Sequence, residues 1–294
     1  MQRYRQLCQR LTALLCAVLL NTGQNAWAEP AQIVLVIDDI GNDYSLGERA
    51  AQLPGAVHLS ILPYSPFGAE LAEMAAKQNK EVLVHLPMSN VHHLPLGNGA
   101  VTSQMDQASF EAQLDKSLAA VPYSKGVNNH MGSELTQMKE PMDWLMADLK
   151  KRGLYFIDSR TTSRSVAEKE ALKHHLPVLR RNVFLDNQRS PDAIAGQFHT
   201  LIEKARSEGI AVGIGHPYPE TLAFLEQVLP TLDEQSISLV LTSQLVSQHN
   251  ILTCRSSQLQ KACPTPFQIA SQSRDVDPKV KNSAKKTSNK VAPK

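Results

Sequence analysis

Acidic, amide and histidine side chains recur in this 294-residue chain at the ends of short apolar segments. Asp38 and Asp39 directly follow the apolar run 33–37, and His216 comes just after the run 210–214. The same kind of position is taken by a further set, namely His85, Asn128, Asn129, His130, Asp158, Ser159, Arg160 and Asp186. The carboxyl ends of parallel strands converge on one face of a sheet. If the apolar segments are strands, we expect these side chains to gather in one polar site.

The chemistry of this set is that of a metal-dependent hydrolase. An aspartate with two histidines is a common ligand set for a divalent ion, and we expect Zn²⁺. Such an ion lowers the pKa of bound water and polarises a carbonyl group. A second aspartate could accept the proton of the water, and a separate histidine could protonate the leaving group. The residues available for these roles are Asp38, Asp39, His85, His130 and His216.

Each of these residues also has a structural interpretation. A single aspartate after a strand often caps a turn, and His85 lies between Val84 and Leu86 as a core histidine would. The adjacent carboxylates of Asp38 and Asp39 are harder to explain in this way, because like charges repel unless a cation or hydrogen bonds stabilise them. Competing signatures, such as a G-x-S-x-G elbow, a Walker A loop or H-E-x-x-H, are absent from the sequence.

Short apolar segments alternate with longer amphipathic ones from residue 33 onward. We expect strands over 33–37, 57–62, 82–86, 126–129, 154–157, 210–214 and 237–241, with one more within 177–185. We expect helices over 68–78, 109–121, 141–152, 191–208 and 220–228. This alternation predicts a single distorted (β/α) barrel of seven to eight mostly parallel strands over residues 29–250, with a doubly wound sheet as the alternative. The long loop 89–104 is placed to cover a site.

The first 28 residues have the pattern of a secretory signal peptide. Three arginines precede an apolar run over 11–20, and Ala26-Trp27-Ala28 offers an A-x-A cleavage site. The run is shorter than the roughly 20 residues that a membrane span needs. We therefore expect a periplasmic protein without a transmembrane segment after cleavage. An uncleaved N-terminal anchor is the alternative.

Charge and cysteine content describe the rest of the chain. The formal net charge is +2, but residues 1–28 carry +3 and residues 274–294 carry +5, which leaves about −6 between them. That charge excludes a nucleic-acid-binding core. Residues 270–294 form a basic tail expected to be disordered, either simply solvated or in contact with anionic envelope components. In the extension 251–269 we expect a Cys254–Cys263 disulfide.

An ordered set of motifs carries a family resemblance over residues 33–246. The segment 33–41, IVLVIDDIG, resembles the first motif of NodB-like polysaccharide deacetylases, a strand that ends in paired aspartates. The segments HLPM (85–88), NNHMGS (128–133), FIDSRT (156–161) and IGHP (214–217) resemble the divergent branch of that superfamily.

The resemblance implies a distorted (β/α) barrel and a metal-dependent removal of an N-acetyl group from a sugar. It implies that Asp38 is the base, that Asp39 binds the metal, and that His216 is the acid. Asp158 is expected to orient His216 and so to belong to the catalytic set. The residues expected to bind substrate are Asn129, Ser159, Arg160 and Asp186.

The sequence departs from the family pattern at two places. Typical members carry both histidine ligands in one H-x-x-x-H motif, whereas Ser89 stands four residues after His85. We therefore expect His130, on the next strand, to supply the second histidine. The arginine that holds the base is missing from its usual motif, and the candidates to replace it are Arg160, Arg180 and Arg181.

The function expected is a hydrolase that removes acyl groups from a carbohydrate polymer or oligosaccharide of the cell envelope. Two alternatives stay open. One is a catalytically silent carbohydrate-binding or scaffold protein that keeps the deacetylase fold. The other is a metal-dependent hydrolase of the same fold that cleaves an amide outside sugars.

Overall fold

The computed structural model describes residues 30–247. The chain divides into two compact units, Met1–Pro30 and Ala31–Lys294, and almost all described residues belong to the second. The expected signal peptide, the Cys254–Cys263 disulfide and the basic tail lie outside the described residues. Within residues 30–247, no helix is long and apolar enough to cross a membrane.

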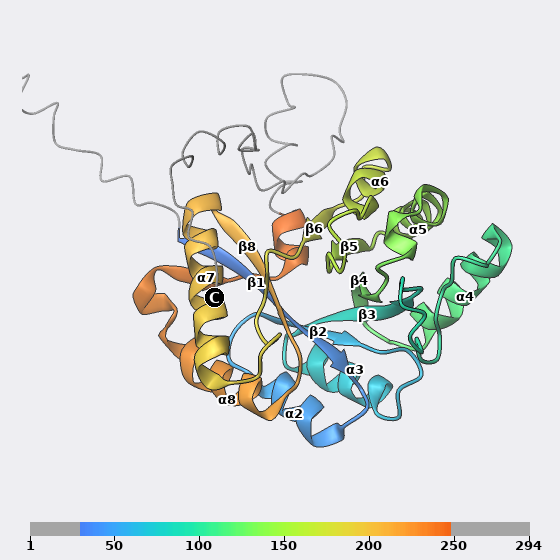
Figure 1. The fold of residues 1–294 in the computed structure, drawn as a ribbon. Coiled ribbons are helices and arrows are strands. Elements are labelled where there is room, and N and C mark those ends of the chain that lie inside the picture. Colours follow the sequence, from blue (N-terminus) through green and yellow to red (C-terminus); the bar gives the residue numbers. More distant parts are fainter. Residues whose placement is uncertain (1–29, 248–294) are drawn as a thin grey trace, which may run out of the picture. The chain divides into compact units, whose positions relative to one another are not determined.

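Within residues 30–247, nine parallel strands form one sheet. The sheet is curled, as Figure 1 shows. Eight of them follow the order β6-β5-β4-β3-β2-β1-β8-β7, and β9 pairs with the beginning of β1. The strands are β1 (Ala31–Ile40), β2 (Val57–Ile61), β3 (Glu81–Met88), β4 (Ser124–Met131), β5 (Tyr155–Asp158), β6 (Val178–Arg180), β7 (Val183–Phe184), β8 (Ile210–Gly215) and β9 (Ile237–Leu239). The expected distorted (β/α) barrel is thereby confirmed.

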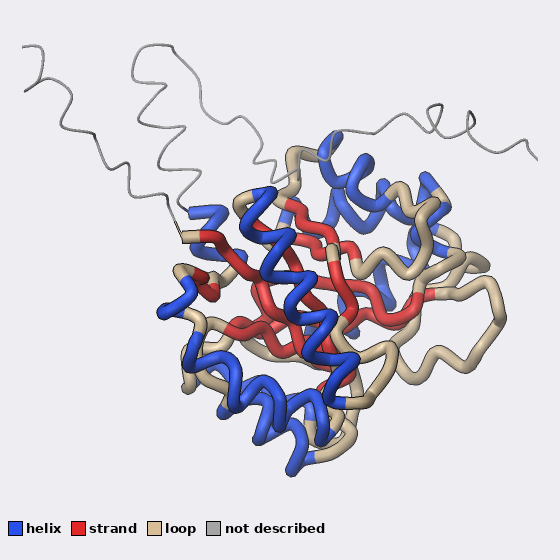
Figure 2. Tube along the Cα trace, turned by 60° about the vertical axis from the view of Figure 1, so that its left-hand side comes forward, coloured by secondary structure: helices blue, strands red, loops and turns tan. Residues whose placement is uncertain are grey.

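Helices cover the outside of the sheet, as Figure 2 shows. They are α2 (Tyr44–Gln52), α3 (Gly68–Lys77), α4 (Gln107–Ala119), α5 (Lys139–Lys151), α6 (Ala167–Lys173), α7 (Pro191–Glu208) and α8 (Pro219–Val228), with short 3₁₀ turns at Leu135–Gln137, Leu229–Thr231 and Asp233–Gln235. Side chains cap several of them, since Asp43, Asp106 and Ser190 accept hydrogen bonds from the first turns of α2, α4 and α7. Such caps fix where a helix begins.

Both faces of the strands are buried, which explains their unbroken apolar sequences. In β1, Ile33, Leu35 and Ile37 belong to the large cluster between the sheet and the helices. Val34 and Val36 belong to a second cluster inside the barrel, with Leu83, Tyr155, Ile157, Leu179, Val212, Ile214 and Leu245. The alternation of side chains along each strand therefore decides which residues face the barrel interior.

The barrel is open between β6 and β7. The sheet path ends at these two strands, although only Arg181 and Asn182 separate them in sequence. The single strand expected within 177–185 is thus two short strands at opposite ends of the sheet, and the chain crosses the opening between them. In this crossing segment, Arg181 contacts the residues that follow β5. Its Nε donates to the Ser159 carbonyl (2.7 Å) and its Nη2 to the Arg160 carbonyl (2.9 Å).

Candidate functional site

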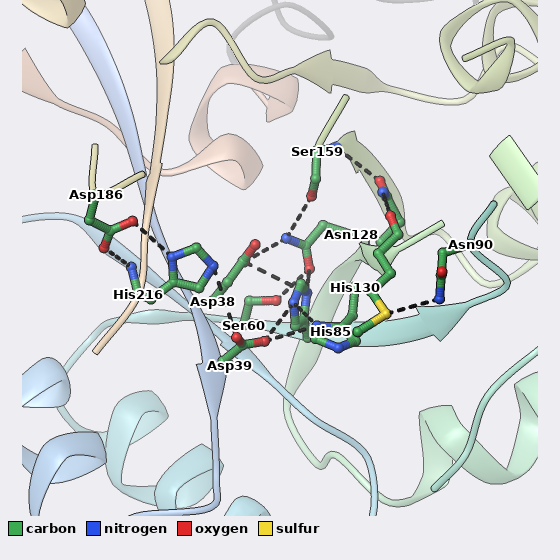
Figure 3. A network of polar contacts seen from close by, with 12 residues as sticks. Asp38, Asp39, Ser60, His85, Asn90, Asn128, His130, Ser159, Asp186 and His216 are labelled. Atoms are coloured by element: carbon green, nitrogen blue, oxygen red, sulfur yellow. Dashed lines mark hydrogen bonds and ion pairs between the residues drawn. The ribbon is translucent and has the colours of Figure 1, made fainter. Parts of the chain in front are cut away.

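Three side chains from separate strands converge at the carboxyl end of the barrel (Figure 3). Asp39 Oδ1 lies 3.1 Å from His85 Nε2 and 2.9 Å from His130 Nδ1, and the two imidazole nitrogens are 3.1 Å apart. The side chains come from the ends of β1, β3 and β4. The sequence-predicted residues Asp39, His85 and His130 therefore form one cluster.

This cluster fits a divalent metal ion. Among the described residues, Asp39 Oδ1 is a buried oxygen that lacks a hydrogen bond of normal geometry, although two imidazole nitrogens face it at close range. One carboxylate oxygen and two imidazole nitrogens within 4.8 Å of one another are the donor set that Zn²⁺ and related ions prefer. A divalent ion held by Asp39, His85 and His130 would give this oxygen a partner.

The electrostatics of the cluster favour a cation. Burial lowers the pKa of His85, but the charges and contacts of Asp38 and Asp39 outweigh it and raise that pKa to about 9. Burial raises the pKa of Asp39, but its contacts with His130 and His85 outweigh this effect and hold that pKa far below its ordinary value. Two carboxylates thus make the site strongly attractive to positive charge.

An irregularity at the end of β1 directs both aspartates into one site. Successive side chains of a strand point to opposite faces, so Asp38 would face the barrel interior and Asp39 the helices. The register of β1 with β2 shifts between Ile37 and Ile40, and Asp39 has φ +57°, in the left-handed region. Such a bulge re-aims a side chain. Consequently Asp38 Oδ1 lies 3.7 Å from one His85 nitrogen and Asp39 Oδ1 lies 3.1 Å from the other.

Asn128 connects Asp38 to the metal cluster. Its Nδ2 donates to Asp38 Oδ1 (2.7 Å), which fixes the orientation of the amide, because a carboxylate only accepts. Asn128 Oδ1 then accepts from His85 Nδ1 (2.9 Å) and from the Ser60 hydroxyl. When the ring is neutral, as a metal ligand must be, the proton on Nδ1 leaves the lone pair of His85 on Nε2, which faces Asp39. A metal ligand is oriented by this kind of outer contact.

Asp38 is a buried carboxylate with a perturbed pKa. Burial raises the pKa of Asp38, and this effect outweighs the charges of His85 and His216 and the hydrogen bond from Asn128, which lower it. A carboxylate of this kind is suited to take up a proton at a reaction centre.

His216 approaches the cluster from the side opposite His85 and His130 (Figure 3). Its Nε2 lies 3.9 Å from Asp39 Oδ2, and its Nδ1 lies 2.8 Å from Asp186 Oδ1. Asp186 Oδ2 accepts from the His216 backbone N–H (2.6 Å) and from Thr221 (2.9 Å). Burial lowers the pKa of His216, but the contact with Asp186 outweighs it, so the pKa is raised.

The His216 ring is also held between two aromatic rings. Phe184 is stacked on it at 6.2 Å between centroids, and Tyr218 lies at 5.4 Å. The guanidinium of Arg181 covers the Phe184 ring, and that of Arg189 covers the Tyr218 ring, each at 3.7 Å. These contacts leave only Nε2 of the imidazole directed toward the cluster.

The expectation that Asp158 orients His216 is wrong. The Asp158 carboxylate accepts from the Arg160 backbone N–H (2.8 Å) and from Ser165 (2.7 Å), whereas Asp186 contacts His216. The reason is strand alternation. Tyr155 and Ile157 of β5 face the barrel interior, so Asp158 points toward the helices.

Most of the residues expected to bind substrate instead form hydrogen bonds with other protein groups around the site. Asn129 is buried, donates to the Met131 carbonyl (2.7 Å) and accepts from the Ser159 backbone N–H (2.9 Å). Ser159 is buried, and its hydroxyl contacts Asn128 Nδ2 at 3.3 Å. Asp186 is buried against His216. Arg160 is half-buried with φ +47°, and its side chain reaches the Ser163 carbonyl at 3.5 Å.

Ser60 and Thr221 belong to the site but were not predicted from the sequence, and Asn128 was expected at the site without a role. For Asn128 a signal existed. Asn128 and His130 are two residues apart on one strand and must face the same side, whereas Asn129 faces the other. The same rule places Asp186 on the side of Phe184, inside the barrel.

Comparisons with known proteins agree with this architecture. A model of the divergent polysaccharide deacetylase family matches residues 35–246. The uncharacterized protein YibQ of Escherichia coli K12 is 34% identical over 222 residues, which is 76% of this chain and 69% of that protein. An uncharacterized protein of Haemophilus influenzae is 34% identical over 206 residues, 69% of this chain and 73% of its own length.

A solved structure shows the same fold. The crystal structure of an uncharacterized protein from Agrobacterium tumefaciens C58 superposes with a TM-score of 0.71 at 21% identity, covering 74% of this chain and 90% of its own. With the family match covering residues 35–246, the chain belongs to the divergent polysaccharide deacetylase family.

Proposed function

We propose that this protein is a metal-dependent hydrolase that removes N-acyl groups from a carbohydrate of the cell envelope. The observation that carries the proposal is the convergence of Asp39, His85 and His130 on one point, with Asp38 beside His85 and His216 beside Asp39. Membership of the deacetylase family supports an acylated sugar as the substrate class.

Each residue has a role in this proposal. Asp39, His85 and His130 would hold the ion, and Zn²⁺ best matches one oxygen and two nitrogen donors. When bound, the ion would polarise the amide carbonyl and lower the pKa of a water molecule. Asp38, buried and oriented by Asn128, accepts the proton of the attacking water. His216, whose Nδ1 is held by Asp186, donates from Nε2 to the leaving amine.

The first experiment measures metal content and acetate release on the same preparations. We expect the wild-type protein to bind about one equivalent of Zn²⁺ and to release acetate from chitooligosaccharides or peptidoglycan fragments. His130→Ala and Asp39→Ala should lose both properties, because each removes a donor atom. Asp38→Asn should keep the metal and lose the activity.

The outcomes separate the alternatives. Metal binding without acetate release from any acylated sugar, but with measurable sugar binding, would favour the catalytically silent binding protein. Absence of metal uptake on adding Zn²⁺, Co²⁺ or Ni²⁺ would contradict the proposal as a whole.

The proposed place of action is the periplasm, and it is supported by the signal-peptide pattern of residues 1–28. N-terminal sequencing of the protein recovered from a periplasmic fraction should begin at Glu29. Recovery of the uncleaved chain in the membrane fraction would instead establish an N-terminal anchor.

A further inference from the structure

A cleft of about 440 Å³ lies directly beside the metal cluster. Asp39 and His130 line it together with Leu62, Pro63, Tyr64, Ser65, Asn42, Pro87, Pro95, Leu96, Gly97 and Asn98. Apart from these two cluster residues, the lining side chains carry no charge. They offer apolar surface interspersed with amide and hydroxyl groups, which complements a neutral ligand that has both apolar faces and hydroxyls.

Tyr64 is the exposed aromatic side chain of this cleft. Its side chain is 48% exposed, although an aromatic ring gains about 1.5–3 kcal/mol when it is buried. Gly99 packs against the ring so closely that a Cβ there would lie 2.9 Å from Tyr64 Cε2. The loop 89–104 thus packs against the ring at Gly99, while about half of Tyr64 stays exposed.

A second cleft, of about 330 Å³, is lined by sequence neighbours of residues that line the first. Met131, Leu94, Val91, Thr161 and Arg164 are among its lining residues. Met131 follows His130 and Leu94 precedes Pro95, so neighbouring residues of the same two segments line the two clefts. His130 and Pro95 thus line the first cleft, and their chain neighbours Met131 and Leu94 line the second.

Exposed apolar side chains are concentrated around these clefts. Within residues 30–247, five large apolar side chains are exposed, and Tyr64, Val91 and Leu94 of these line a cleft, while Phe67 shares the β2–α3 loop with Tyr64. Exposed apolar groups in a concave polar setting mark a ligand site. The fifth, Tyr123, precedes β4 at the other end of the sheet.

We propose that the two clefts form one groove for a carbohydrate chain, and that Tyr64 is the platform on which a sugar ring next to the reacting sugar stacks. This inference rests on the proposed function and adds to it the residue that would hold the sugar next to the reacting one. The apolar C–H face of a pyranose matches an aromatic ring, and the groups of Asn42, Asn98 and Ser65 match its hydroxyls.

The test is equilibrium binding, which does not depend on turnover. Full-length protein carrying Asp38→Asn is titrated with N-acetylglucosamine and its di-, tri- and tetramers by calorimetry. We expect affinity to rise with chain length. Tyr64→Ala should weaken binding of the tetramer about tenfold, whereas Tyr64→Phe and Tyr64→Trp should stay within about threefold of the parent, because the ring persists.

Tyr123→Ala is the matched control. Tyr123 is 57% exposed and has φ +64°, close to the 48% and +59° of Tyr64, but it lies away from the clefts. This control should leave binding unchanged. Leu94→Ala should weaken binding of the tetramer but not binding of the dimer, because only the longer ligand reaches the second cleft.

Each result has a distinct meaning. Tetramer binding that is unaffected by Tyr64→Ala would overturn the platform, and affinity independent of chain length would overturn the groove, while acetate release would still support the proposed function. Absence of binding to every oligomer together with absence of acetate release would remove the proposed function and this inference together.

Discussion

At the scale of single residues, the site depends on hydrogen bonds that fix protons on particular atoms. Asn128 donates to Asp38 and accepts from His85, so one amide sets both the orientation of the proposed base and the tautomer of a proposed metal ligand. Asp186 does the same for His216 from the other side. The groups that would do the chemistry therefore depend on partners that never touch the substrate.

Asp186→Asn should lower kcat by roughly 10³-fold, because an amide in place of the carboxylate no longer stabilises the protonated imidazole and no longer selects the Nδ1–H tautomer. Metal content should be unchanged, since Asp186 does not contact Asp39, His85 or His130. Acetate release and elemental analysis on the same sample measure the two effects.

Asp158→Asn is the matched comparison for Asp186→Asn. Asp158 is an equally buried carboxylate at a strand end, but it contacts Ser165 and the Arg160 backbone instead of His216. Asp158→Asn should lower the melting temperature but change kcat little. Equal losses of kcat in both variants at full metal content would contradict the assignment of Asp186.

The sequence was sufficient to predict that Asp39, His85 and His130 would meet, because each follows or ends an apolar strand. It was not sufficient to choose between Asp158 and Asp186. Both faces of β5 and β7 are apolar, so alternation in the sequence does not reveal which face lies inside the barrel. That choice requires the position of each strand in the curled sheet.

At the scale of elements, the turn after β1 is the part that positions the site. Asp39 takes a left-handed conformation, and the next residues pass close to the β2–α3 loop before Asp43 caps α2. Gly41 has φ +126°, and a Cβ on it would lie 1.9 Å from Ser65 Oγ and 2.7 Å from Ser65 Cβ. The contact between this turn and the β2–α3 loop requires a glycine.

Gly41→Ala should therefore lower the free energy of unfolding by roughly 2–4 kcal/mol, the combined effect of backbone strain and overpacking. It should also reduce metal affinity, since the turn that carries Asp39 must shift. Chemical denaturation and competition with a chelator measure these two effects.

Gly153→Ala serves as the control for strain alone. Gly153 also has a positive φ, +70°, but nothing lies within 4 Å of a Cβ added there. Gly153→Ala should lower the free energy of unfolding by only about 1 kcal/mol and leave the metal affinity unchanged. Retained metal affinity in Gly41→Ala would show that the turn does not position Asp39.

The element pattern was largely readable from the sequence because buried parallel strands are short apolar runs and amphipathic helices separate them. Where one strand was expected within 177–185, two short strands stand at opposite ends of the sheet. The polar residues Arg180 to Asn182 interrupt this segment, but the hydrogen bonds that Arg181 and Asn182 form at the opening join residues far apart in sequence and cannot be read from it. Helices α2 and α6 were missed because they are short.

At the scale of the whole molecule, the end of the barrel opposite the site is closed by a buried polar network. Glu81, the first residue of β3, accepts from Tyr155 at the start of β5 (2.6 Å) and from the Ser243 backbone N–H (3.0 Å). His58 of β2 lies 3.3 Å from Glu81, and its Nε2 contacts Thr242 at 3.1 Å. Leu245, two residues beyond Ser243, packs inside the barrel.

This network should make the stability of the fold depend on acid pH. Burial raises the pKa of Glu81, but its contacts with His58, Ser243 and Tyr155 outweigh it and lower that pKa from 4.5 to about 2. A carboxyl group whose pKa is lowered on folding stabilises the protein at pH values above its pKa in the unfolded chain. The contribution of Glu81 is therefore complete above about pH 4.5 and is lost as the pH falls toward about 2.

The measurement compares the pH dependence of unfolding in wild type and Glu81→Gln by denaturation between pH 7 and pH 2. Across this range the free energy of unfolding should fall by about 3 kcal/mol more in the wild type than in the variant. The other carboxyl groups titrate alike in both proteins, so their effects cancel. Since the network lies away from the metal cluster, metal affinity at pH 7 should be the same in both. Parallel pH curves would mean that the pKa of Glu81 is the same in the folded and the unfolded protein, and that the network does not stabilise the charged form of Glu81.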